Sequence, residues 1–348
     1  MRSIVNIDFL IIGQGLAGSL LAWELIRRGC SVLVLDHGTE NASQVAAGLI
    51  NPITGMRLVK STEVDELLPV AKQCYAQLAQ CFGQVFYHER MMLRLLSQPA
   101  DERQALKRLS DPAYQPYLGK LYHEQPHTFL EQKQTGYLLT RNLLSCMRDY
   151  FSARNSYHKA DFNCAELLFK PILRWQHIAP ARIIFCDGHY ASQSPWFSWL
   201  PFQLAKGEIL TMEHLSPIPQ TLLNYGNWLI PTGQQQFRIG ATFDTQTINT
   251  HPSQAAKHTL INALTQVKPE FAQARCLNHQ ANIRPCTRDK QPFLGFHPRF
   301  QQLAIFNGFG AKGSLQIPWY SQQFANALRH NTPIPADIQR YYATHFPS

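Results

Sequence analysis

The chain has 348 residues, 45% hydrophobic and 16% charged, a composition that excludes a disordered protein and allows two domains. No apolar stretch is long enough to span a membrane, and eight cysteines without a C-x-x-C pair are typical of a cytoplasmic protein with reduced thiols. The formal net charge of +9 suggests an anionic partner, although lysine and arginine are scattered, which is not typical of a nucleic-acid-binding protein.

The apolar run at residues 7–12 predicts a buried strand, and it begins so early that we expect no signal peptide before it. It ends in a Gly-x-Gly-x-x-Gly motif formed by Gly13, Gly15 and Gly18. In such motifs the first glycine permits a tight turn, the second leaves room for a pyrophosphate, and the third lets the next helix pack closely. The helix predicted over residues 19–28 would offer its N-terminal N–H groups to the phosphates.

A second apolar run, residues 32–36, ends in an acid. Asp36 follows Gly18 at the spacing at which an acid accepts hydrogen bonds from the ribose hydroxyls of an adenosine. The three glycines, the two flanking strands and the terminal acid together predict a dinucleotide-binding unit.

The remaining elements follow from hydrophobic periodicity and capping residues. We expect Pro69 to kink the first of the later helices or to mark its start. The predictions in chain order are a helix over 62–80, irregular or short-helical chain over 98–135, a strand over 136–139, a helix over 141–151 capped by Thr140, a strand over 182–188, an antiparallel sheet over 206–244, a helix over 253–267, a strand over 303–308 and a helix over 314–328.

Residues 123–127 spell the H-E-x-x-H pattern of zinc proteases. That pattern binds zinc only on a helix, where the two histidines share a face. Pro126 lacks an N–H and would clash with the preceding turn, so we expect a solvated loop here and no metal in the protein.

Three further segments carry a resemblance: residues 43–52 (SQVAAGLINP), 283–295 (IRPCTRDKQPFLG) and 307–314 (NGFGAKGS). Together with the N-terminal motif they resemble the D-amino-acid oxidase superfamily, the FAD enzymes that include glycine oxidase, sarcosine oxidase and D-amino-acid dehydrogenases. The resemblance implies an α/β fold in which a Rossmann-type FAD-binding domain is interleaved with an α+β substrate domain containing an antiparallel sheet. The expected limits are 1–60, 136–198 and 284–348 for the first, and 61–135 and 199–283 for the second.

The resemblance also implies a non-covalent FAD, since no cysteine stands where sarcosine oxidases attach their flavin. The cofactor-binding residues that it implies are Gly13, Gly15, Leu16, Ala17, Gly18, Asp36, His37, Ser43, Ala46, Ala47, Gly48, Leu49, Gly188, Gly308, Phe309, Gly310, Ala311, Lys312 and Gly313. Two departures from the family pattern stand out. Asp187 and His189-Tyr190 replace small residues and a tryptophan, and residues 151–170 contain no match to the adenine-contacting strand.

Two residues are expected to act in catalysis by this resemblance. Arg284 would grip the substrate carboxylate through a bidentate, charge-assisted fork. Lys312 would lie beside the flavin edge, where a cation stabilises reduced flavin or superoxide. Tyr225, Trp228 and Arg238 belong to the sheet expected to cover the substrate pocket, and for at least two of them core packing is the favoured role.

The activity that follows from the resemblance is oxidation of an amino acid or amine by hydride transfer to flavin N5, followed by imine hydrolysis. The small-molecule substrate, the electron acceptor and the oligomeric state stay open. One alternative is the oxidase of the bifunctional tRNA wobble-uridine enzyme, which removes a carboxymethylaminomethyl group and would make tRNA a partner. A second alternative is a non-catalytic FAD-binding protein.

Overall fold

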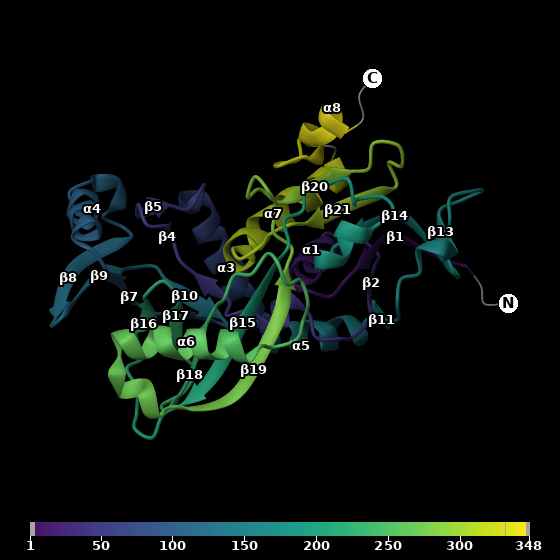
Figure 1. Cartoon of the computed structure of the whole chain (residues 1–348). Helices are drawn as coiled ribbons and strands as arrows, with labels where there is room; N and C mark the ends of the chain where they lie inside the picture. Colours follow the sequence, from purple (N-terminus) through teal and green to yellow (C-terminus); the bar gives the residue numbers. More distant parts are fainter. Residues whose placement is uncertain (1–3, 331, 346–348) are drawn as a thin grey trace. The chain divides into compact units, whose positions relative to one another are not determined.

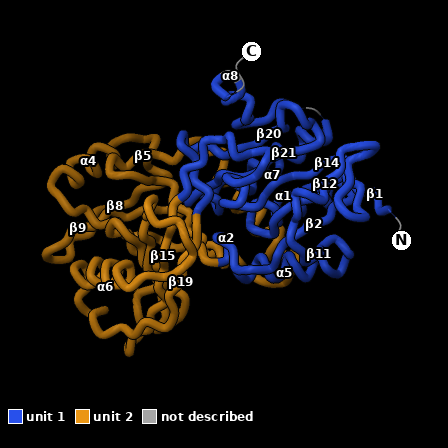
Figure 2. Tube along the Cα trace, turned by 45° about the vertical axis from the view of Figure 1, so that its right-hand side comes forward, with its two compact units in different colours: residues 1–44, 140–204, 284–348 blue, residues 45–139, 205–283 orange. Residues whose placement is uncertain are grey.

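The computed structural model describes residues 4–330 and 332–345. The chain forms two compact units and passes between them four times (Figure 2). Unit 1 comprises residues 1–44, 140–204 and 284–348, and unit 2 comprises residues 45–139 and 205–283.

These limits differ from the expected domain limits at three places. Residues 45–60 and 136–139 belong to unit 2, where β3 (Leu49–Ile50) pairs with β10 (Gly136–Leu138) and β10 pairs with β6 (Tyr87–Glu89). Residues 199–204 belong to unit 1. The small-residue segment after residue 44 is therefore held by strand pairing inside unit 2.

Unit 1 is built on a mixed eight-stranded sheet (Figure 1). Its parallel part runs in the order β11 (Tyr157–Lys159), β2 (Val32–Asp36), β1 (Val5–Ile12), β14 (Ile178–Phe185) and β21 (Leu303–Asn307). Antiparallel pairs are added by β12 (Leu167–Leu168), β13 (Arg174–Trp175) and β20 (Phe293–Phe296). Since β1 lies between β2 and β14, the carboxyl ends of these strands form a topological switch point, where α/β sheets bind ligands.

Three helices accompany this sheet: α1 (Leu16–Arg27), α5 (Thr140–Ser152) and α7 (Gly313–His330). Helix α1 contacts both α5 and α7 as well as β1 and β2, and its first three turns are almost wholly buried. This extensive burial fits its mostly apolar sequence. In α5 the buried side chains recur every three or four residues, as one buried helix face requires: Leu143, Leu144, Met147 and Phe151. The short helices α2 (Ala42–Val45) and α8 (Tyr342–His345) complete the set.

Unit 2 is built on a second eight-stranded sheet, which is mostly antiparallel. Its strands in spatial order are β19 (Arg275–Arg284), β15 (Ala205–Glu213), β18 (Gln236–Gly240), β17 (Trp228–Pro231), β16 (Leu222–Asn224), β7 (Met92–Leu96), β9 (His127–Gln132) and β8 (Leu118–Glu124). Helix α6 (Gln254–Val267) packs on β15, and its Leu260 and Leu264 are buried in one core with Phe237 and Ile239. The unit also holds α3 (Val64–Phe82), α4 (Pro99–Leu109) and the small hairpin of β4 (Ile53–Thr54) and β5 (Val59–Lys60).

Most expected elements are present, including the second strand with the predicted limits and the antiparallel pairing of β15, β17 and β18. The helix expected over 62–80 is α3, and Pro69 lies inside it rather than at its start. The expectation for residues 98–135 was wrong, because the segment holds α4 and the β8–β9 hairpin. Within the described residues, no helix is long and apolar enough to cross a membrane.

Candidate functional site

The turn that follows β1 is shaped by two glycines that the fold itself requires. Gly13 has φ of 103°, and a Cβ there would lie 2.6 Å from the carbonyl oxygen of Cys186. A Cβ at Gly18 would lie 2.0 Å from the carbonyl oxygen of Gly13. Gly15 differs, since its φ is −73° and the nearest atom to a Cβ is Ser43 Oγ at 3.3 Å. A Cβ at Gly15 would thus meet no backbone atom, and its one tight contact is with a side-chain hydroxyl that a small shift can move.

The N-terminus of α1 opens onto this turn. Its N-cap residue, Gly15, supplies no side-chain cap, and the first turn, which includes Leu16 and Ala17, contains no acid. The Leu16 N–H donates to Ser43 Oγ at 3.0 Å. A hydroxyl that accepts a hydrogen bond still has one proton to donate. The helix dipole and the Ser43 hydroxyl thus suit an anion at this position.

Asp36, at the end of β2, is buried and braces the glycine turn. One carboxylate oxygen accepts the Gln14 N–H at 2.8 Å and the other accepts the Gly38 N–H at 2.7 Å. The Gln14 side chain is itself held, because it donates to the carbonyl of Leu144 and accepts from the side chain of Arg148. Each oxygen of Asp36 keeps a second lone pair for a ribose hydroxyl. The role of Gln14 was not predicted from the sequence.

The chain after β2 lies beside two aromatic rings. The ring of His37 is 5.5 Å from that of Tyr190, which in turn is 4.2 Å from the ring of His189. Burial, with a smaller effect of His37, lowers the pKa of His189, which favours the neutral ring. The short helix η3 (Gly188–Gln193), with Gly188 as its first residue, carries two of these rings.

Residues 151–170, which showed no match to the family pattern, contain β11 beside β2. Lys159 is aligned with Asp36, and the Ala160 N–H donates to the Asp36 carbonyl at 3.0 Å. The strand is only three residues long and half exposed, so its sequence gave no periodic signal.

The turn after β21 is organised by Asn307, which is buried. Its side-chain N–H group donates to the carbonyl of Gly188 at 2.9 Å and to Asp187 Oδ1 at 3.3 Å. Its side-chain oxygen accepts the Gly308 N–H at 2.8 Å. Asn307 therefore ties the turn after β14 to the turn after β21. The sequence analysis predicted neither contact.

The glycine-rich turn itself lies against the chain that follows Arg284. Gly308 has φ of 82°, and a Cβ there would lie 2.7 Å from Thr287 Cγ2. A Cβ at Gly310, where φ is 52°, would lie 3.3 Å from Cys286 Sγ. The ring of Phe309 packs on Phe306 and Tyr320, so this residue offers only its backbone to a ligand. Ala311 is exposed, and Gly313 begins α7.

Lys312 is exposed at the N-terminus of α7, where its carbonyl accepts the N–H groups of Leu315 and Gln316. Partial desolvation, and then the charge of Lys290, hold the pKa of Lys312 below its usual value. A cation at a helix N-terminus is disfavoured by the dipole. This end of α7 is therefore a region of positive potential that suits an anion.

Arg284 is the last residue of β19 and is half-buried. Burial lowers its pKa, an effect that Cys286 partly offsets, and an arginine stays charged under such a shift. The Cys286 N–H donates to the Arg284 carbonyl at 2.9 Å, and the Gly310 N–H donates to the Pro285 carbonyl at 3.3 Å. Arg284 and the Gly308–Gly313 turn are thus joined through two residues.

Ala46, Ala47, Gly48 and Leu49 belong to unit 2, whereas the other predicted cofactor residues belong to unit 1. Gly48 has φ of 70°, and a Cβ there would lie 2.0 Å from the Leu138 carbonyl oxygen. Arg238, on β18, donates to the carbonyl groups of Val45 and Ala46. We infer that Arg238 holds the small-residue segment in place, a role that the sequence analysis did not consider.

Core packing accounts for the other two residues of the sheet. Trp228 packs against Gly240, where a Cβ would lie 2.7 Å from the indole ring. Tyr225 packs against the core that contains Phe237 and Leu260, and burial raises its pKa well above the usual value.

The H-E-x-x-H segment is not helical, in agreement with the expectation from Pro126, but it lies on a β-hairpin and not in the expected loop. His123 ends up on β8 and His127 on β9, with Gln125-Pro126 as the turn. Among the described residues, no group of three or more His, Cys, Asp or Glu could hold a metal ion.

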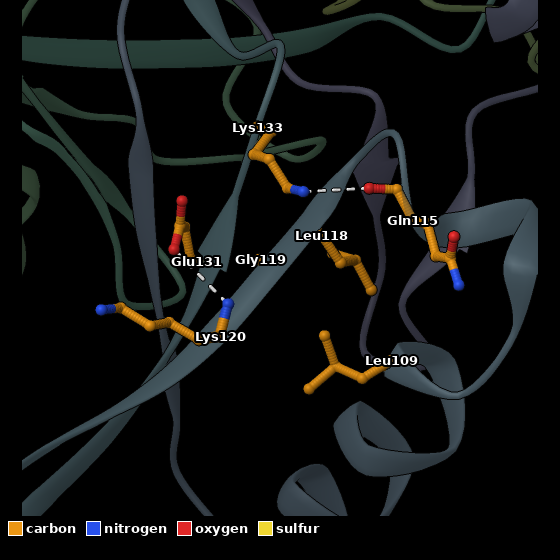
Figure 3. Close-up of a pocket in the computed structure, with 7 residues that line it drawn as sticks. All are labelled: Leu109, Gln115, Leu118, Gly119, Lys120, Glu131 and Lys133. Atoms are coloured by element: carbon orange, nitrogen blue, oxygen red, sulfur yellow. Dashed lines mark hydrogen bonds between the residues drawn. The ribbon is translucent and has the colours of Figure 1, made fainter.

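The same hairpin lines an open hollow of about 420 Å³ (Figure 3). Its charged groups have partners within the protein, since Lys133 donates to the Gln115 carbonyl and Glu131 accepts the Lys120 N–H. None of the predicted site residues lines it.

The residues at the carboxyl edge of the unit 1 sheet fit an FAD molecule. The uncapped helix N-terminus at Gly15 and the buried Asp36 suit the pyrophosphate and ribose. The hydroxyl of Thr287, beneath Gly308, is buried and has no hydrogen-bond partner within the described residues. A buried polar group without a partner costs free energy unless a ligand satisfies it.

Comparison with known proteins agrees with this geometry. Residues 8–160 and 171–327 match the family described as DAO: FAD dependent oxidoreductase. A glycine oxidase of Geobacillus kaustophilus is 21% identical over 344 residues, which cover 89% of this chain and 90% of the relative. The crystal structure of glycine oxidase from that organism has a TM-score of 0.81 and 18% identity, covering 94% of this chain and 95% of its own.

A third similar protein is named for a different activity. The tRNA 5-methylaminomethyl-2-thiouridine biosynthesis bifunctional protein MnmC of Acinetobacter baylyi is 23% identical over 368 residues. The alignment covers 95% of this chain but 54% of the bifunctional protein, so this chain spans about half the length of that relative.

Proposed function

The chain belongs to the DAO family of FAD-dependent oxidoreductases, which act on C–N donors, and from this premise we propose that it oxidises an amino acid or secondary amine bearing a carboxylate. The observation that carries the proposal is the position of Arg284, a half-buried cation joined by two residues to the Gly308–Gly313 turn. A guanidinium in such a place forms a planar, charge-assisted fork on a carboxylate.

The residues of this chain bind the substrate and the cofactor and orient the substrate. Arg284 holds the carboxylate, so that the C–H next to nitrogen is presented in one direction. Gly13, Gly15, Asp36 and the N-terminus of α1 hold the dinucleotide, without a covalent bond to a cysteine. Bound FAD supplies the hydride acceptor, and water then hydrolyses the resulting imine to an oxo acid and ammonia or an amine.

Lys312 contributes positive potential at the N-terminus of α7, where negative charge develops when the cofactor is reduced. No side chain is needed as a base if the substrate nitrogen reacts as the neutral amine. All eight cysteines lie within the described residues and none is in a disulfide, which supports a cytoplasmic location.

Anaerobic mixing of the purified, FAD-loaded protein with a panel of amino acids and amines tests the proposal. Loss of the oxidised flavin absorbance with carboxylate-bearing amines, and not with the matching amino-acid amides, is the expected result. A flavin that no amine of the panel reduces would support the non-catalytic alternative.

One observation favours a second candidate, the removal of a carboxymethyl group from a modified tRNA. The excess charge is concentrated in unit 1, which has 17 Lys and Arg against 10 Asp and Glu, and the similarity to MnmC covers 95% of the chain. Salt-dependent retention of tRNA by the protein, together with flavin reduction by the tRNA that carries the group, would establish this candidate.

A further inference from the structure

Asp187 is an acid for which the proposed reaction has no use. It is the second residue after β14, at the same edge of the sheet as Gly13 and Asp36. A Cβ at Gly13 would lie 3.1 Å from the Cα of Asp187, so the acid's backbone abuts the turn where the pyrophosphate is expected. Asp36 ends β2 and Asp187 lies just beyond β14, so acids stand on both sides of β1.

The partners of Asp187 do not neutralise a negative charge. Asn307 donates one hydrogen bond to Oδ1, and the side chain makes no salt bridge within the described residues. The other titratable groups that interact with Asp187 are the thiols of Cys164 and Cys186. Burial, and then the charge of Asp187, raise the pKa values of both thiols. His189, two residues further on, has His37 as its charged neighbour.

Burial dominates the ionisation of this group. It raises the pKa of Asp187 from 3.8 to about 7, although its own backbone hydrogen bond and that of Asn307 oppose the shift. Near neutral pH the carboxyl group is thus divided between its neutral and charged forms. A dianionic pyrophosphate placed at the neighbouring turn would repel the charged form and favour the neutral one.

We propose that Asp187 takes up a proton when FAD binds. The FAD site therefore binds the cofactor tightly while this carboxyl group is neutral and weakly once it ionises. The inference rests on the FAD site at the carboxyl edge of the unit 1 sheet. Asn307 hydrogen-bonds to the Asp187 carboxyl group, to Gly188 and to Gly308. The charge of Asp187 therefore affects the turns after both β14 and β21.

The test is the dissociation constant of FAD for the full-length protein stripped of flavin, measured by fluorescence quenching between about pH 5.5 and 8.5. Wild-type affinity should fall about tenfold or more over this range, since each unit of pKa change on binding corresponds to a factor of ten. Asp187→Asn should bind as tightly as wild type does at low pH and show no such fall. Its neutral amide keeps an oxygen for Asn307.

Three control variants separate the effect of Asp187 from that of its neighbours. Asp36→Asn should weaken FAD at every pH and keep the slope, because Asp187 is still present. Cys164→Ser and Cys186→Ser should also keep the wild-type slope of FAD affinity against pH. A slope that persists in Asp187→Asn, or a wild-type affinity that does not change with pH, would overturn the proposal. Failure of wild type to bind FAD at any pH would instead overturn the cofactor site itself.

A second measurement needs no variant. Calorimetric titration of the wild-type protein with FAD at about pH 8, in two buffers of different ionisation enthalpy, gives the number of protons exchanged on binding. A net uptake that rises toward one proton per FAD is expected. No uptake, or a release, would contradict the proposal even if Asp187→Asn did not fold.

Discussion

Gly18 lies so close to Gly13 that a Cβ on the first would be 2.0 Å from the carbonyl oxygen of the second. Gly15, between them, has no such neighbour, since the nearest atom to its Cβ position is 3.3 Å away in a serine side chain. In the same motif, two glycines are thus required by close backbone contacts, whereas the only tight contact of a Cβ at Gly15 is with a side chain that can shift.

Gly15→Ala should leave the melting temperature of the flavin-free protein almost unchanged and weaken FAD about tenfold to a hundredfold, the effect of forcing one methyl group into a filled site. The larger Gly15→Val should abolish FAD retention. Gly18→Ala is the matched control, and it should lower the melting temperature by about 4 °C or more. If Gly15→Ala bound FAD as wild type does, the pyrophosphate would not lie at this turn.

Arg284→Ala should raise the KM for the best carboxylate substrate by about two orders of magnitude or more, since charged hydrogen bonds contribute about 1.5–3 kcal/mol each. Arg284→Lys should restore only part of this loss, because an ammonium cannot form the planar fork. The KM is measured by steady-state kinetics for wild type and both variants, and FAD content and melting temperature are measured on the same preparations.

Arg288 provides the control for this substitution, because it lies in the same segment and is exposed. Arg288→Ala should leave the KM near the wild-type value. Loss of FAD or of thermal stability in step with activity in Arg284→Ala would identify Arg284 as a structural residue.

Lys312→Met should slow either the reduction of the bound flavin or its reoxidation, because it removes the cation at the N-terminus of α7. Besides burial, the charge of Lys290 lowers the pKa of Lys312. Lys290→Met should therefore raise the pKa of Lys312 and move the alkaline limb of the pH–rate profile to higher pH. Stopped-flow rates across the alkaline range measure both effects. Unchanged rates in Lys312→Met would remove this residue from the catalytic set.

The raised pKa of Asp187 also predicts how the stability of the flavin-free protein depends on pH. An acid that ionises less readily when folded destabilises the protein as soon as the unfolded chain ionises, from about pH 4 upward. The penalty grows until the pH passes the folded pKa of about 7 and is then constant. Asp187→Asn should melt a few degrees above wild type at pH 8, with a smaller difference at pH 5. Equal melting temperatures at pH 8 would contradict the shift.

The parts of the fold that local patterns encode could be predicted from the sequence. The limits of β2 were predicted to the residue because an apolar run ends in an acid. The helix predicted over 253–267 begins one residue later, at Gln254, since Ser253 is its N-cap. The β8–β9 hairpin was missed, since its polar strands carry no continuous apolar run and its prolines suggested irregular chain.

Much of the site depends on contacts between residues far apart in the sequence. Asn307 reaches Asp187 across 120 positions, and Arg238 reaches Ala46 across 192. Neither residue stands in a motif that implies its partner. A buried asparagine directly before the glycine-rich turn was the one available signal for the first contact.

The pairing of β1 has a consequence for synthesis on the ribosome. Phe9 pairs with Val32 on one side but with Arg182 on the other, and β14 in turn pairs with β21, which ends at Asn307. The partners of the first strand on this side are thus translated much later, and contacts of such long sequence separation form slowly. The nascent chain is therefore unable to complete this sheet, on whose carboxyl edge the proposed FAD site depends, before residue 307 has been synthesised.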